Sequence, residues 1–160
     1  MSIINQIRAA LDTHISSISG LPTVVNQNLK YTPSEDTPFI TTALVPATIR
    51  PAVMGLYPQQ RYQGIYQLLV CTPQGNGAGL GYDYADTILQ HINVSDDISF
   101  SPSSDLLLMQ SGDTLLLESG DALLLDNTIF VTVAYAEVGA SYLDTPFYCT
   151  PVTISWFTYH

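Results

Sequence analysis

The sequence predicts an α+β fold, with an antiparallel sheet and two helices packed on one of its faces. Three observations indicate it: a helical pattern at residues 2–18, alternating apolar and polar residues in four later segments, and a second helical pattern between the two strand pairs. This order of elements is typical of a sheet that carries its helices on one side. With 160 residues, 46 % of them apolar and 11 % charged, the chain is expected to form a single domain over residues 1–160.

Both helices are predicted from apolar residues that recur at steps of three and four positions. The first has Ser2 as its N-cap and ends before Gly20. The second follows a glycine-rich turn and ends near Ile92. The apolar positions are Ile4, Ile7, Leu11, Ile15 and Ile18 in the first helix, and Ala85, Ile88, Leu89 and Ile92 in the second.

The four β segments are predicted to form two antiparallel pairs. Residues 37–45 and 61–72 alternate with a period of two and are separated by a tip of about 15 residues, rich in proline and glycine, which predicts a hairpin with a long, irregular tip. Long loops of this kind often bind a partner. Residues 128–138 and 145–159 alternate in the same way and are expected to be joined by a short turn around Gly139.

Residues 99–127 contain an internal repeat with a period of eight: DLLLMQSG, DTLLLESG and DALLLDNT. A helix would scatter this period around its surface, whereas a short strand followed by a Ser-Gly-Asp turn uses it fully. We therefore expect small β-hairpins or a stacked β-ribbon, inserted into an older domain. Its leucine triplets predict either a contact surface or an aggregation hazard.

The charge is distributed unevenly along the chain. Residues 1–80 hold four basic and three acidic side chains, whereas residues 81–160 hold eleven acidic side chains and no Lys or Arg. Four cations are too few for a phosphate-gripping surface, so direct nucleic-acid binding is not expected. An acidic surface suits a wall that DNA passes without sticking, or simply keeps the protein in solution. No run approaches the roughly 20 apolar residues that cross a bilayer, and we expect a protein made in the cytoplasm without a membrane partner.

The two cysteines, Cys71 and Cys149, lie in apolar segments far apart in sequence. Neither belongs to a CxxC pair, and no nearby histidine completes a zinc pattern. Two buried free thiols in a reducing compartment are expected, with a disulfide between them as the alternative.

No cofactor, metal or catalytic set is predicted, although three patterns come close. The glycine-rich run from Gly75 to Gly81 lacks the spacing of a dinucleotide fingerprint and the Lys of a phosphate-binding loop, so a flexible or closely packed turn is the expectation. The repeated aspartates are too sparse for a calcium-binding β-repeat and are expected to close turns. These are Asp105, Asp113 and Asp121.

The third pattern is a carboxylate pair with a nearby base. Asp83 and Asp86 are three residues apart on the second helix, and with His91 they define a carboxylate-dependent hydrolase as the lowest-ranked function. Acidic residues in a first helical turn more often favour the helix dipole. His14 and His160 are likewise isolated in sequence, and isolated histidines are more often packing residues than bases.

Several strings resemble the tail terminator proteins of long-tailed, non-contractile bacteriophages. They are IRAALDTHI with SGLP, YTPSEDTPFI, RYQGIYQLLVCTPQGNGAGLGYDYADTI, and TPVTISWF near the end. The resemblance covers nearly the whole chain except residues 99–127. Its most specific part is the spacing of Arg61, Gly64, Tyr66, Pro73, Gly77, Ala85 and Asp86.

The resemblance implies a structural virion protein without catalysis. It implies a homo-oligomeric ring, of six copies, that binds the last ring of the tail tube protein, stops its growth and presents its other face to the head connector or stopper protein, with DNA passing through the lumen. It places the protein in the tail and neck of the virion, assembled in the host cytoplasm. At the ring interface we expect Arg50 and Arg61 to meet acidic groups of a neighbouring copy, because cations are scarce in this acidic protein. The alternatives are an adhesive or ligand-binding module presented by the β-repeat, and another neck, connector or minor tail protein.

Overall fold

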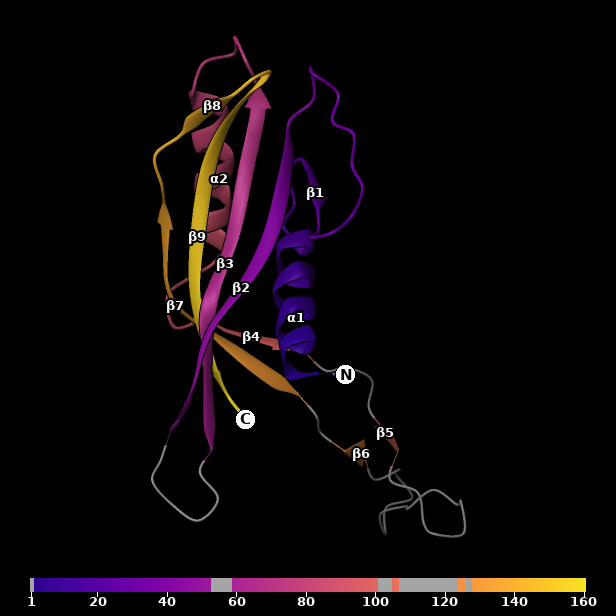
Figure 1. Cartoon of the computed structure of the whole chain (residues 1–160), viewed down its shortest axis with the longest axis vertical. Helices are drawn as coiled ribbons and strands as arrows, with labels where there is room; N and C mark the ends of the chain where they lie inside the picture. The colour runs from indigo at the N-terminus through magenta and orange to yellow at the C-terminus, as the bar shows by residue number, and fades with distance from the viewer. Residues whose placement is uncertain (1, 53–58, 101–104, 107–123, 126–127) are drawn as a thin grey trace.

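The computed structural model describes residues 2–52, 59–100, 105–106, 124–125 and 128–160, and Figure 1 shows their arrangement. Within this part of the chain, a seven-stranded sheet has the order β1-β2-β3-β9-β7-β4, with β8 paired to β9. Only the β1–β2 pairing of this described sheet is parallel. The prediction of an α+β fold built on a largely antiparallel sheet is therefore confirmed. The strands are β1 Thr23–Val25, β2 Phe39–Pro51, β3 Gln60–Pro73, β4 Asp97–Phe100, β5 Asp105–Leu106, β6 Leu124–Leu125, β7 Ile129–Val138, β8 Tyr142–Asp144 and β9 Phe147–Tyr159.

The two predicted helices are present as α1, Ile3–Ser17, and α2, Gly79–His91. The Ser2 side chain caps α1 by accepting a hydrogen bond from the Asn5 amide at 3.4 Å, as expected for an N-cap serine. Part of the glycine-rich run belongs to α2, which begins at Gly79, earlier than its apolar pattern indicated. The predicted apolar positions of both helices are buried except Ile4, which is exposed, and Leu89, which is partly buried. Within the described residues, no helix is long and apolar enough to cross a membrane.

The core lies on the face of the sheet that carries Tyr66, Leu68 and Val70 of β3. These three side chains have no exposed surface, and side chains from both helices belong to the same buried cluster. Trp156 of β9 and Val131 of β7 extend the cluster across the sheet. Burial of large apolar side chains supplies most of the free energy that holds such a fold together.

The first hairpin is paired further than the sequence indicated. β2 and β3 stay in register from Phe39↔Cys71 to Pro51↔Gln60, with an irregularity between Pro46 and Thr48. The described part of the expected irregular tip is thus mostly paired strand. Pro46 keeps its partner Gly64, and the register shift falls on Ala47, which has no partner in the ladder. Residues 53–58, at the end of the hairpin, lie outside the described part.

The second strand pair also differs from the expectation. The short turn at Gly139 does not join the two predicted strands directly, because a further strand, β8, intervenes and pairs with β9 across a turn at Thr145–Pro146. The parallel edge strand β1 was also not predicted. Its three residues are too few to show a period in the sequence.

Most of the octad repeat lies outside the described residues. Two short strands at its ends, β5 and β6, pair antiparallel through Asp105↔Leu125 and Leu106↔Leu124. Beside them, Phe100 of β4 pairs with Ile129 of β7. Residues 101–128 therefore connect two neighbouring positions of the sheet, one on β4 and one on β7.

The expectation of two free thiols is wrong, because Cys71 and Cys149 form a disulfide. The sheet register places them directly opposite each other on β3 and β9, with their Cα atoms 4.1 Å apart. They form a small second cluster with Phe39 and Phe147, whose rings meet edge to face at 5.0 Å. Seventy-eight residues separate the cysteines in sequence, so their pairing depends on the strand order and could not be read from local spacing.

Candidate assembly interface

The distal part of the first hairpin, residues 45–51 of β2 and 60–65 of β3, is here called the arm. It extends to the lower end of the molecule in Figure 1, away from α2 and β8. Along it, residues 45–51 of β2 are all exposed. Val45, Ile49 and Ile65 are exposed large apolar residues, with 49 %, 57 % and 36 % of their surface accessible. Exposed apolar side chains grouped on one projecting element are typical of a contact surface.

A close approach at Gly64 shapes the base of the arm. A Cβ at this position would lie 2.6 Å from the Val45 carbonyl oxygen and 2.7 Å from Cζ2 of Trp156, so only glycine fits here. Gly64 pairs with Pro46 beside the strand irregularity, and the Gln63 side chain donates to Thr48 Oγ1 at 2.7 Å. These contacts fix how the arm leaves the sheet.

Trp156 lies beside a groove at this point. The groove has a volume of about 300 Å³ and is lined by Ile4, Tyr62 and Trp156 together with residues 46–49 and Gln63. The indole is 1 % exposed, and its Nε1 has no hydrogen-bond partner within the described part of the chain. An unpaired buried N–H costs free energy.

The two arginines predicted at an interface are brought together by the arm. Arg50 and Arg61 are cross-strand partners in the β2–β3 register. The guanidinium of Arg61 lies over the Phe157 ring, 4.5 Å from its centroid, and 6.0 Å from that of Tyr159. This stacking holds Arg61 close to the sheet, whereas Arg50 is exposed.

Two like charges directly opposite each other on a sheet are destabilising unless something neutralises them. The ion pair found among the described residues joins Arg8 to Asp12. Within this part of the chain, neither Arg50 nor Arg61 has a carboxylate partner. The Nε atom of Arg61 is buried and lacks an acceptor in the same part of the chain. The arm therefore presents uncompensated positive charge on a protein of net charge −10.

The candidate hydrolase residues are not assembled into a catalytic group. Asp86 accepts from Gln90 Nε2 at 2.7 Å, and His91 Nδ1 donates to the Thr87 carbonyl oxygen at 2.8 Å, both within one turn of α2. Asp83 is exposed, but α2 begins at Gly79 and its first turn holds neither aspartate, so the expectation of acidic residues in the first turn is wrong. Within the described residues, no group of three His, Cys, Asp or Glu side chains could hold a metal ion.

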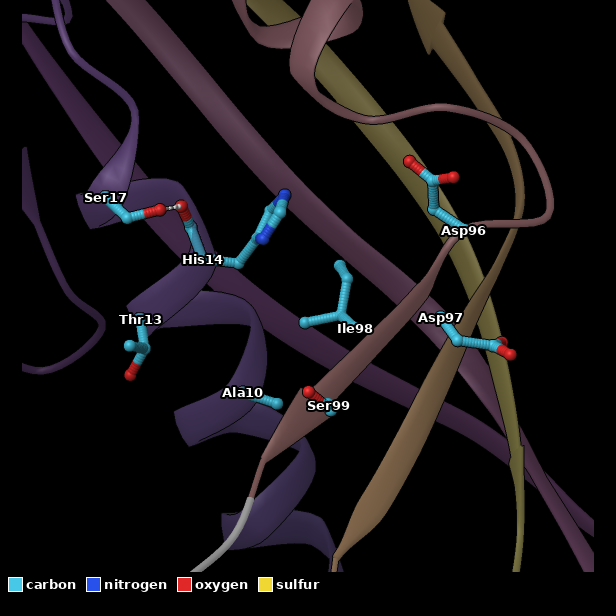
Figure 2. A pocket seen from close by; sticks show the side chains of 8 residues that line it. All are labelled: Ala10, Thr13, His14, Ser17, Asp96, Asp97, Ile98 and Ser99. Atoms are coloured by element: carbon cyan, nitrogen blue, oxygen red, sulfur yellow. Dashed lines mark hydrogen bonds between the residues drawn. The ribbon is translucent and has the colours of Figure 1, made fainter.

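A pocket between α1 and β4 contains other titratable residues, and Figure 2 shows its lining. The His14 ring points into the space between the two elements, and its Nε2 donates to the His91 carbonyl oxygen at 3.3 Å. Asp96 accepts from the Asn93 amide at 3.1 Å, and Asp97 accepts from Thr132. Ser17 donates to the His14 carbonyl. The pocket thus lacks a nucleophile hydrogen-bonded to a base, which a hydrolase would need.

The glycine-rich run has a conformational explanation. Gly75 and Gly77 have positive φ angles of 101° and 76°, and a Cβ on Gly81 would lie 3.0 Å from Thr150 Oγ1. The run is therefore a turn followed by close packing of α2 on β9, as the failed phosphate-loop spacing indicated. For the repeat aspartates, Asp113 and Asp121 lie outside the described residues, and Asp105 is placed only as part of β5.

Comparison with known proteins yields one family. A family model described as phage tail terminator protein matches residues 6–156. Several solved structures match, and one of them does so with a TM-score of 0.58 and 20 % identity, covering 96 % of this chain and 94 % of the other, which shows that the fold is shared. No curated protein matches.

Proposed function

Because this chain belongs to the phage tail terminator family, we propose that it forms a ring that caps the tail tube, stops its polymerisation and joins it to the head connector. The family match confirms the resemblance drawn from the sequence. It supports a structural protein of the phage tail, which associates with the tail tube and other assembly partners, and not an enzyme. Ring closure, capping and head joining are the proposal.

The observation that carries the proposal is the uncompensated positive charge of the arm. Arg50 lies opposite Arg61 without a carboxylate on either among the described residues. A second copy of a protein with four basic and fourteen acidic side chains offers an abundant supply of acidic partners. Contact between copies would neutralise the cross-strand repulsion and cover the apolar side chains of the arm.

The remaining features of the protein suit a ring through which DNA passes. We include three further features in this proposal: a ring of six copies, a single domain over residues 1–160, and a β-repeat inserted at about residues 99–127. The adjacent positions of Phe100 and Ile129 support the insertion, since a short turn could join them. The lack of Lys and Arg in residues 81–160 favours a surface that does not retain DNA. The proposed location is the tail and neck of the virion, after assembly in the host cytoplasm.

A tube-capping assay tests the proposal. Tail tube protein is polymerised with and without this protein, and tube lengths are measured by negative-stain electron microscopy. We expect tubes to stop growing and to carry a ring at one end. Tubes that grow to the same length and bear no terminal ring would contradict the proposed function.

The role of the arm is tested with the double charge reversal Arg50→Glu and Arg61→Glu. The introduced glutamates would then face acidic groups of a neighbouring copy. Because this repulsion is screened least at low salt, we expect the rings to dissociate there. Lys30→Glu, at an exposed position in the loop before β2, is the control for a charge reversal away from the arm. Rings of the double variant that remain intact at low salt would refute the pairing of these arginines with a neighbour.

A further inference from the structure

The end of the molecule opposite the arm has complementary properties. In Figure 1, β8 and the start of α2 lie at the upper end, and the arm reaches the lower end. The Ser141 hydroxyl lies 3.3 Å from the Tyr82 hydroxyl, which links the segment before β8 to α2. Asp83, Asp86 and Asp144 are exposed at this end. We call it the acidic end.

A cleft opens at the acidic end between α2 and the end of β7. It has a volume of about 480 Å³ and is lined by Tyr82, Ala85, Asp86 and Leu89 of α2 and by residues 138–140. Beside it, Tyr142 and Leu143 of β8 are exposed, at 47 % and 55 %. The surface therefore combines apolar walls with carboxylates.

We infer that the arm of one copy docks in this cleft of a second copy. The inference rests on the proposed ring and names the surfaces that form it. Arg50 would lie against Asp86, with Val45 and Ile65 of the same arm face covering the apolar walls. The described residues that line the cleft, and the carboxylates of α2 and β8 beside it, lie within residues 81–160, which contain no Lys or Arg, so no cation of that segment competes for these carboxylates.

Two other exposed carboxylates, Asp96 and Asp97, are less suited to the arm. Asp96 accepts from two nitrogens of Asn93, both at 3.1 Å, whereas Asp86 accepts from the Gln90 side chain of its own helix. Asp97 accepts from the Thr132 hydroxyl. Both aspartates line the pocket between α1 and β4, whose described walls lack large exposed apolar side chains to match those of the arm.

The placement of the two surfaces determines the type of assembly. They are different surfaces at opposite ends of one molecule, so the contact is heterologous. A repeated heterologous contact forms a ring when its rotation closes on itself. An arm-to-cleft joint is thus compatible with a closed ring and does not require two-fold symmetry between copies.

The experiment uses the full-length chain and two exposed single variants, Arg50→Glu and Asp86→Arg. Each alone places like charges at the joint, and we expect association to weaken by at least about tenfold in sedimentation velocity. Lys30→Glu and Asp36→Arg are controls with the same charge changes on the loop before β2.

An equal mixture of the two variants restores opposite charges at every joint between unlike copies. The Asp86→Arg variant keeps Arg50 on its arm, which meets the unchanged Asp86 of the Arg50→Glu variant. In the reverse joint, the introduced glutamate of one variant meets the introduced arginine of the other. Association should therefore recover in the mixture, and also in the double variant, which carries both changes in one chain.

Three results would overturn the inference. They are wild-type association in either single variant, no recovery in the mixture, and a wild-type chain that stays monomeric in solution. Circular dichroism of each variant shows whether the fold is retained, so loss of folding cannot imitate a broken joint. The proposed function is judged separately by the tube-capping assay: rings that cap tubes while the mixture fails to recover would reject the arm-to-cleft joint alone.

Discussion

The hydroxyl of Tyr66 donates a hydrogen bond of 2.6 Å to Oδ1 of Asp12, joining α1 to the centre of the sheet. Tyr66 has no exposed surface, and Asp12 is 7 % exposed. Oδ2 of the same carboxylate accepts from Arg8 at 3.1 Å, and Thr42 of β2 lies within 3.5 Å of Oδ1. One buried carboxylate thus ties together three elements of the core.

Replacing Asp12 with Ala should destabilise the fold by about 1–3 kcal/mol, because the buried Tyr66 hydroxyl would lose its acceptor. Urea unfolding measures the change, and Asp36→Ala on the exposed loop is the control. A double-mutant cycle with Tyr66→Phe should give a coupling energy of about 0.5–3 kcal/mol. A coupling near zero would mean that the two side chains act independently.

The same contact predicts sensitivity to alkaline pH. Burial, together with the neighbouring Asp12 carboxylate, raises the pKa of Tyr66 well above its ordinary value. The folded state therefore keeps the phenol proton where the unfolded chain releases it. The contribution of Tyr66 to the free energy of unfolding is therefore fully present below about pH 10. Above that pH it falls by up to about 1.4 kcal/mol per pH unit.

Tyr66→Phe should flatten this fall, because phenylalanine has no proton to lose. Denaturant unfolding from about pH 9 to about pH 11 compares the wild type with the variant. Equal slopes in the two proteins would show that Tyr66 does not govern alkaline unfolding.

Gly64→Ala tests the close approach at the base of the arm. The added methyl group would meet the Val45 carbonyl and the Trp156 ring, both below 3 Å, and we expect a loss of about 1–3 kcal/mol. Trp156 is the single tryptophan of the chain, so its fluorescence reports directly on the site. Gly79→Ala, where a Cβ meets nothing within 4 Å, is the matched control. Unchanged stability and emission in Gly64→Ala would refute the steric requirement.

The elements with clear periods in sequence were predictable. Ile7, Leu11 and Ile15 recur at helical steps and are buried in α1, and Tyr66, Leu68 and Val70 alternate along β3 as predicted. In both cases the local pattern and the tertiary burial agree. Arg50 and Arg61 were selected because cations are scarce, but only the strand register shows that they face each other.

Other features depend on contacts between distant segments. The disulfide needs β3 and β9 to be neighbours, and the sequence does not fix which strands pair. The continuation of β2 past Pro46 needs a glycine on the opposite strand, which only the register identifies. The cleft at the acidic end is likewise formed by α2 and β7, whose proximity has no local signal.

The disulfide between Cys71 and Cys149 should contribute about 2–4 kcal/mol, because it closes a long loop in the unfolded chain. Replacing both cysteines with Ala should lower the denaturation midpoint by a corresponding amount while leaving the fold intact. A thiol assay in denaturant checks the bond itself, and we expect no reactive thiol before reductant is added. Two reactive thiols in the unreduced protein would contradict the bond.

The β-repeat should be removable without loss of the fold. Since Phe100 and Ile129 are paired on neighbouring strands, replacing residues 101–128 with an Asn-Gly turn would convert β4 and β7 into a simple hairpin. We expect cooperative thermal unfolding and unchanged Trp156 emission in the shortened protein, because Trp156 packs within the core cluster. The tube-capping assay then separates the roles of the repeat. Loss of tube-length control would assign it to assembly, whereas normal capping with altered attachment of particles would assign it to adhesion. A shortened chain that no longer folds would show instead that residues 101–128 are part of the domain and not an insertion.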